Sequence, residues 1–432
     1  MRRSRFVLAC VGVAAFLAGP VPSASAQAPE ALRQEIEQLR RDFEAVQKQY
    51  GERLTAIEAR LGSTLPSTTA PPAAPQQTAQ VPPGAEGAGG PSGALPVYGG
   101  AAAGSKIFNP DIAVIGDFLG AAGRNTVNPS PAMEMHESEA SFQAVLDPYA
   151  RADFFISFGQ EGVELEEGFV TFPTVPGGLL VKVGKLRAAF GKVNTFHNHV
   201  LPWTDRPLVT NNLLGGEEGI GDAGISVARL IPNPWLFLEA TGQVYRGNSS
   251  DVFASTTRGD LSYVGHLRAY QDISEDTNVD FGVSYARGHN ASGVVDNLDV
   301  GRFATGIWGL DATVRWRPLK RSIYHSFVGR SEVMWSRRDQ FGGLQRSLGF
   351  YVSGDFQLAR RWFAGARYDR SDRADDAALR DDGQSVLLTY WPSEFSQIRG
   401  QYRRTKYATG PTANELLFQF LFSIGAHGAH PF

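Results

Sequence analysis

Residues 308–317 read WGLDATVRWR, and this short stretch decides the class of fold. The large apolar side chains of Trp308, Leu310, Val314 and Trp316 stand at even-numbered positions, with polar or small residues between them. In an extended chain, successive side chains point to opposite faces. The period of two therefore predicts a strand with one apolar and one polar face.

The same alternation recurs over residues 105–432. It gives about sixteen segments, near residues 112, 133, 149, 163, 179, 224, 235, 260, 277, 304, 325, 346, 362, 384, 396 and 413. Tight links between segments alternate with longer ones around 120–132, 192–222, 247–259, 288–303 and 371–382. Short periplasmic turns and long external loops are typical of outer-membrane barrels. The sequence predicts an all-β fold, a transmembrane antiparallel β-barrel of about sixteen strands.

Residues 1–26 have the pattern of a secretory signal peptide, with basic residues, then an apolar run, then Ala24-Ser25-Ala26. The one cysteine, Cys10, lies inside the apolar run, so cleavage after Ala26 is expected and leaves no thiol. A mature chain without thiols excludes disulfides, cysteine metal sites and a cysteine nucleophile. No other segment has the run of about 18 apolar residues that a membrane-spanning helix needs.

Residues 27–62 contain a seven-residue repeat, with Ile36, Phe43, Tyr50 and Ile57 in one register. The repeat predicts a short α-helical coiled coil ahead of the barrel, in the periplasm. Two interpretations remain open: self-association with other copies of the chain, or one amphipathic helix on the protein's own surface. Residues 63–104 are rich in Pro and Ala, with almost no charge, and are expected to be an extended linker.

The stretch GKLRAAFGK at residues 184–192, followed by His197, His199 and Gly215-Gly216-Glu217-Glu218-Gly219, resembles a known family. It is similar to the phosphate-selective (O and P type) outer-membrane porins, and closest to a branch labelled zinc-regulated outer-membrane proteins. The resemblance is best over residues 160–235. It implies a homotrimeric channel of sixteen strands.

The predicted loop over residues 192–222 is the longest in the barrel. An inward-folded loop is the natural way to narrow a wide barrel, although packing outside or across a trimer contact is an alternative. Its two histidines could join an acidic residue to bind a metal such as Zn²⁺, but they do not make a full ligand set, so metal binding stays open. The candidate constriction residues are His197, His199, Asp205, Arg206, Glu217 and Glu218.

A second candidate site is the polar face of the strands, which is expected to line the pore. Mutually neutralising pairs would keep such a wall hydrated, whereas a slight arginine excess would favour anions. The candidate pore-lining residues are Arg151, Arg268, Arg315, Arg317, Arg330, Arg367, Arg399, Arg403, Asp311 and Asp355.

These patterns predict an outer-membrane porin for passive diffusion of small hydrophilic solutes, with a mild anion preference. The alternative is a structural protein whose coiled coil spaces or tethers the membrane to the cell wall. No Ser-His or Asp-His arrangement marks an enzyme, and no cofactor or nucleic-acid partner is expected. The expected partners are outer-membrane lipid and lipopolysaccharide, small hydrophilic or anionic solutes, and possible contacts to the cell wall.

Overall fold

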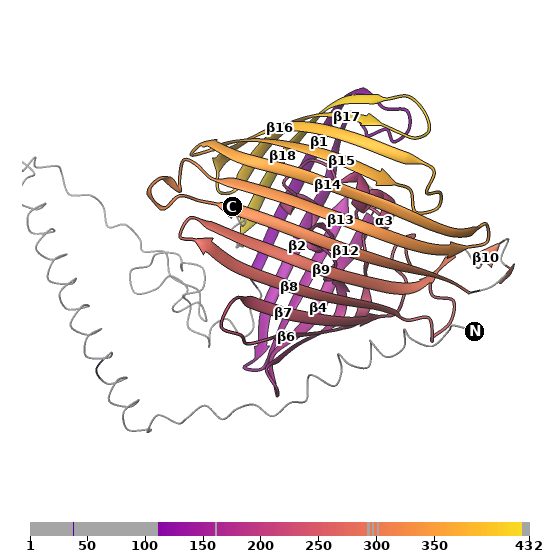
Figure 1. Ribbon diagram of the computed structural model, residues 1–432. Helices are drawn as coiled ribbons and strands as arrows, with labels where there is room; N and C mark the ends of the chain where they lie inside the picture. Colours follow the sequence, from indigo (N-terminus) through magenta and orange to yellow (C-terminus); the bar gives the residue numbers. More distant parts are fainter. Residues whose placement is uncertain are drawn as a thin grey trace, which may run out of the picture. The chain divides into compact units, whose positions relative to one another are not determined.

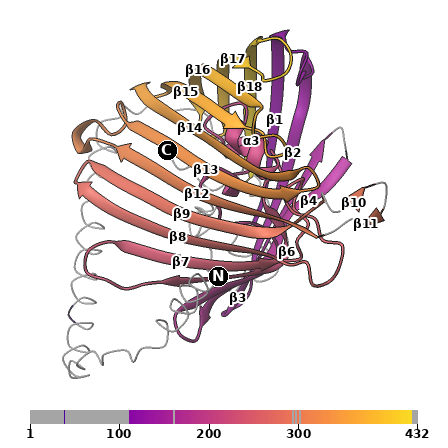
Figure 2. The ribbon, with the colours of Figure 1, turned by 45° about the vertical axis from the view of Figure 1, so that its right-hand side comes forward.

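Sixteen of the described strands form one closed antiparallel barrel in the computed structural model (Figures 1 and 2). The structure describes Gln38 and residues 111–159, 162–291, 294–295, 298–299 and 302–425. The barrel strands are β1 (Asp111–Arg124), β2 (Met133–Asp147), β3 (Ala150–Gly159), β4 (Gly162–Val175), β5 (Leu179–Arg187), β6 (Gly221–Leu230), β7 (Phe237–Tyr245), β8 (Ser262–Ser274), β9 (Thr277–Asn290), β12 (Phe303–Trp316), β13 (Phe327–Gln340), β14 (Gly343–Ala359), β15 (Trp362–Asp372), β16 (Arg380–Ser393), β17 (Ser396–Lys406) and β18 (Ala413–Gly425). The predicted antiparallel β-barrel of about sixteen strands is confirmed.

The alternation of polarity places apolar side chains outside and polar ones inside. In β12 the outward Trp308 is 54% exposed, whereas the inward Asp311 is 4% exposed. Asp311 lies opposite Gly282 of β9 and Glu332 of β13, so the polar faces of neighbouring strands form one continuous inner surface. Such a wall is apolar towards lipid and polar towards the lumen.

The connections sort by length between the two ends of the barrel. All five long connections predicted from the sequence leave one end, including those between β5 and β6 and between β7 and β8. The opposite end carries two-residue links between β2 and β3 and between β14 and β15, and at most ten residues between β12 and β13. A two-stranded ribbon of β10 (Val294–Val295) and β11 (Leu298–Asp299) lies in the connection after β9. The predicted positions of the long connections are confirmed, but the sorting is incomplete, because the two-residue link between β13 and β14 lies at the same end as the long connections.

The barrel closes between β1 and β18, whose pairing runs from Ala113 opposite Gly425 to Arg124 opposite Asn414. The signal peptide (1–26), the coiled coil (27–62, except Gln38) and the linker (63–104) lie outside the described residues, as do residues 426–432. Among the residues that are described, no helix is long and apolar enough to cross a membrane.

The connection between β5 and β6, residues 188–220, folds into the barrel rather than away from it. It contains two 3₁₀ turns, η2 (Val193–Thr195) and η3 (Asn198–Val200), and the short helix α3 (Leu208–Leu214), which packs against β13, β14, β15 and β16. Gly215, with φ of 84°, ends α3 in the left-handed conformation that favours glycine. We call residues 188–220 the inner loop.

Candidate functional site

One attachment holds the start of the inner loop to β9 and β13. The backbone N–H groups of Lys192 and Val193 donate to Glu332 Oε1 at 3.1 and 2.8 Å, and the Gly191 N–H donates to Ser284 Oγ at 2.9 Å. The Lys192 ammonium forms an ion pair with Asp280. Gly191 has φ of 59°, and a Cβ atom there would meet the Glu332 carboxylate, so this bend requires glycine.

A second attachment holds the loop to β15 and β17. Asp205 of the loop accepts hydrogen bonds from Arg367 at 2.9 Å, Arg403 at 3.0 Å and Gln401 at 2.6 Å. Burial alone would raise the pKa of Asp205, but the two guanidinium groups outweigh burial and lower that pKa to about 2. The Arg367 guanidinium also lies over the ring of the fully buried Trp203, 4.9 Å from its centroid.

A third attachment joins the loop to β2 and β4 through His197. Its Nδ1 lies 2.6 Å from Glu139 and 3.1 Å from Glu166, and its Nε2 lies 2.8 Å from Glu167. Burial disfavours the charged imidazole, but the three carboxylates outweigh burial and raise the pKa of His197 well above its usual value. His199, on the same segment, has its Nδ1 3.7 Å from Glu139.

Two β-bulges interrupt the strands of this acidic wall. In β2, Glu137 lies opposite Asp117 and Met135 opposite Phe118, so His136 is an extra residue. In β4, Glu167 lies opposite Phe155 and Leu165 opposite Ile156, so Glu166 is an extra residue. A bulge re-aims side chains that strict alternation would send to opposite faces. Glu166 and Glu167, adjacent in sequence, therefore both contact His197.

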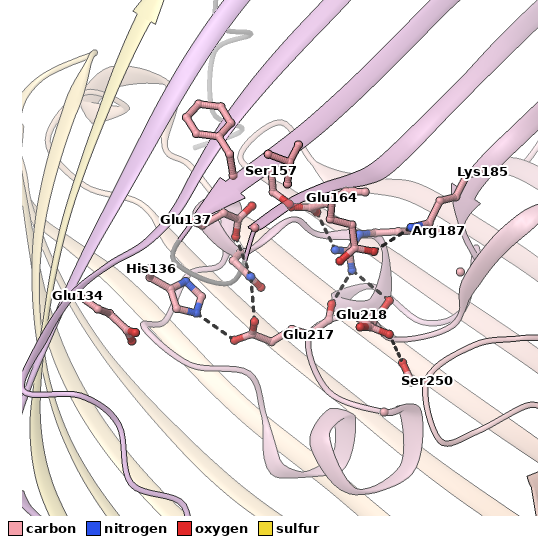
Figure 3. A pocket seen from close by; sticks show the side chains of 18 of the residues that line it. Glu134, His136, Glu137, Ser157, Glu164, Lys185, Arg187, Glu217, Glu218 and Ser250 are labelled. Atoms are coloured by element: carbon pink, nitrogen blue, oxygen red, sulfur yellow. Dashed lines mark hydrogen bonds and ion pairs between the residues drawn. The ribbon is translucent and has the colours of Figure 1, made fainter.

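The other three candidate loop residues have separate roles. The Arg206 guanidinium donates hydrogen bonds to the carbonyls of Val193 at 3.1 Å and Phe196 at 2.6 Å. It also donates to Asn198 Oδ1 at 3.0 Å, so all three bonds connect parts of the loop to one another. Burial lowers the pKa of Arg206 to about 10. Glu217 lies 3.4 Å from His136, and Glu218 accepts a hydrogen bond from Ser250 at 3.2 Å (Figure 3).

Most candidate wall arginines are paired on the inner face. Five of them form ion pairs with carboxylates at 2.5–2.8 Å. The pairs are Arg268–Asp280, Arg330–Asp355, Arg151–Asp153, Arg403–Glu415 and Arg367–Asp369. Arg315 lies 4.0 Å from Asp280, and Arg399 donates to Thr389, Gln419 and the Leu201 carbonyl. Asp311 is buried on β12.

Arg317 does not lie on the inner wall, where the sequence predicted it. The strand β12 ends at Trp316, and Arg317 is exposed in the connection to β13, where it donates to the Ser322 carbonyl. The alternation of residues 308–317 continues one residue past the last strand pair, Trp316 opposite Phe327. Alternation alone therefore could not show that Arg317 lies beyond the end of the strand.

A cavity of about 1160 Å³ opens at the end of the barrel that carries the long connections (Figure 3). Its positive lining residues are Lys185, Arg187 and Arg246, beside His136. Its acidic lining residues are more numerous: Glu134, Glu137, Glu164, Glu166, Glu217, Glu218, Asp222 and Asp251. The cavity therefore has a negative excess, although Lys185, Arg187 and Arg246 each pair with one of these carboxylates.

Sequence reasoning did not identify the residues of β2 and β4 that contact the loop, namely Glu137, Glu139, Glu166 and Glu167. One signal was available, because consecutive acids at 166 and 167 inside a strand break the alternation. The others are single acids in alternating segments, and only the folded loop distinguishes them from ordinary wall residues.

No family model matches the chain. A protein of Aquifex aeolicus (strain VF5), described as uncharacterized, is 29% identical over 386 residues, which cover 76% of this chain and 81% of that protein.

Two solved structures, the anion-selective porin from Comamonas acidovorans and Pseudomonas putida OprB, each superpose with a TM-score of 0.50. The barrel has a porin fold. The sequence identities are 12% and 10%, with 73% of this chain and 99% and 94% of those chains covered, respectively.

Proposed function

We propose that the chain is an outer-membrane porin through which small hydrophilic solutes diffuse passively. The observation that carries this proposal is the inner loop, which is attached to the wall at Glu332, at Arg367 and Arg403, and at Glu139. A sixteen-stranded barrel is wide enough to leave an aqueous channel, and a loop fixed across its interior narrows it. His197, His199, Asp205, Arg206, Glu217 and Glu218 belong to that constriction.

From the slight excess of arginines on the wall, the sequence predicted a mild preference for anions. Their pairing with carboxylates leaves little free positive charge on the described wall, and the cavity at the long-loop end has an acidic excess. Selectivity follows the charge that ions meet along a pore. We therefore propose that this entrance favours cations, and that any anion preference arises deeper in the lumen, near Arg399.

The full chain, purified from outer membranes and inserted into planar bilayers, tests the proposal. We expect stepwise single-channel conductance, and a KCl gradient gives a reversal potential whose sign separates cation from anion preference. A protein that inserts as a β-rich, heat-modifiable species but carries no current would exclude a porin.

We also propose a homotrimer in lipid and lipopolysaccharide, because the sequence resembles porins with that assembly; the mass of the detergent-solubilised protein tests it. The alternative role, a tether between the membrane and the cell wall, depends on residues 27–62. No described contact favours it. The three attachments of the inner loop concern the lumen, which a tether does not need.

A further inference from the structure

We propose that Glu137 and Glu139 of β2, together with His199 of the inner loop, form a binding site for one divalent transition-metal ion. Such an ion would join the loop to the wall. This inference goes beyond the proposed diffusion function, because a porin needs no metal, and it can be tested by binding alone.

The three side chains already converge. One ligand atom from each lies within 4.8 Å of the others, and the side chains come from two segments about 60 residues apart in the sequence. Glu137, Glu139 and His199 are 8%, 3% and 7% exposed, respectively. Zinc binds imidazole nitrogen and carboxylate oxygen at about 2.0–2.2 Å, so small rotations would bring the three atoms around one ion.

An independent observation concerns Glu137. Its Oε2 accepts a hydrogen bond from the Asn198 side chain at 2.9 Å, but its Oε1 is buried and no described donor reaches it. The neighbouring groups are the carboxylates of Glu166 and Glu139. A buried carboxylate oxygen that faces other carboxylates is costly unless a cation or a proton neutralises it.

A second arrangement of ligands, Glu139, Glu166 and His197, is also within reach, but its histidine is already engaged. Both ring nitrogens of His197 lie within 2.8 Å of a carboxylate. A metal would have to displace one of these contacts and detach part of the loop. A metal held by Glu137, Glu139 and His199 leaves the contact between His197 Nε2 and Glu167 in place, because Glu167 is not one of its ligands.

The cavity supplies a path to the site. Glu137, Glu166 and Asn198 line it, and its acidic excess raises the local concentration of cations. A nitrogen ligand favours a transition metal over Mg²⁺, which prefers oxygen ligands and retains its water. Three protein ligands leave the fourth position of a zinc ion for a water molecule from the cavity.

Isothermal titration calorimetry with zinc chloride on the full chain, purified in detergent and freed of metal with EDTA, tests the site. We expect one tight site per chain, and magnesium chloride at the same concentration should give no comparable heat. Glu137→Gln and His199→Gln should each weaken zinc binding roughly ten-fold or more, because each removes a ligand.

The matched control is His325→Gln, at the opposite end of the barrel, which should bind zinc as the unaltered chain does. Equal affinity in all three variants would overturn the site. No zinc binding by the unaltered chain, with higher thermal stability of Glu137→Gln, would show that a shared proton neutralises the carboxylates instead. Conductance measured on the same samples distinguishes failure of the metal site from failure of the porin proposal.

Discussion

Asp205 shows how one residue can hold a long loop in place. It accepts hydrogen bonds from two arginines on different strands, and both guanidinium groups are largely buried. Removing one partner of a buried ion pair leaves the other charge uncompensated, which commonly costs about 3 kcal/mol or more. The position of the loop should therefore be sensitive to this single side chain.

Replacing Asp205 by Asn should lower the stability of the folded barrel by about 3 kcal/mol, for the reason just given. The temperature at which the heat-modifiable band shifts on a gel measures the loss. Asp272→Asn, an exposed carboxylate that accepts a hydrogen bond from Tyr270, is the control and should leave this temperature unchanged. An unchanged Asp205→Asn barrel would mean that the two arginines find other partners.

The contribution of Asp205 should also depend on pH in a defined window. Its folded pKa of about 2 lies below the unfolded value of about 3.9, so the stabilisation is fully present above pH 4. It is lost as the pH falls through the folded pKa. The difference in stability between the unaltered chain and Asp205→Asn should thus be the same at pH 7 and pH 5, and smaller at pH 3. A difference that already declines between pH 7 and pH 5 would contradict the assignment of this effect to Asp205.

At the scale of elements, the inner loop and the two bulged strands act together. The bulge in β4 brings Glu166 to the inner face beside Glu167, Glu139 of β2 lies on the same face, and the loop supplies His197 between these carboxylates. In a regular strand, Glu166 and Glu167 would point to opposite faces, and only one of them could reach His197. The bulge in β4 therefore decides where this part of the loop can be held.

Shortening the inner loop by removing residues 194–214 should raise single-channel conductance, because the deletion takes away α3 and the attachment at Asp205 while leaving all sixteen strands. Bilayer recordings measure the change. Shortening the ten-residue connection between β12 and β13, at the opposite end, is the control and should leave the conductance within error. If both deletions give the conductance of the unaltered chain, the loop does not limit the passage.

For the whole molecule, the barrel strands form a closed set, so no edge strand requires a partner. All sixteen strands of this closed set lie between Asp111 and Gly425. Channel formation should therefore depend on residues 105–432, whereas assembly of several copies can depend on the coiled coil predicted for residues 27–62.

A chain that starts at Ser105 should conduct as the full chain does, but its trimers should dissociate at a lower temperature. Gel mobility of unheated and stepwise heated samples measures dissociation, and bilayer recordings measure conduction. The full chain with Ile36 and Phe43 replaced by Ser is the matched control, because it keeps the length while removing two residues of the apolar repeat. Trimers of equal stability in all three would assign the coiled coil to another partner.

The sequence by itself determined the number of strands, the face to which side chains point in the regular parts of the strands, and the end from which the long connections leave. These features follow from alternation and loop length, which are local properties of the chain. The interior depended on tertiary structure. Asp205 meets Arg403 across 198 residues and His197 meets Glu139 across 58, and no local pattern encodes such pairs. The bulge that brings Glu166 inward beside Glu167 also breaks the alternation that made the strands predictable.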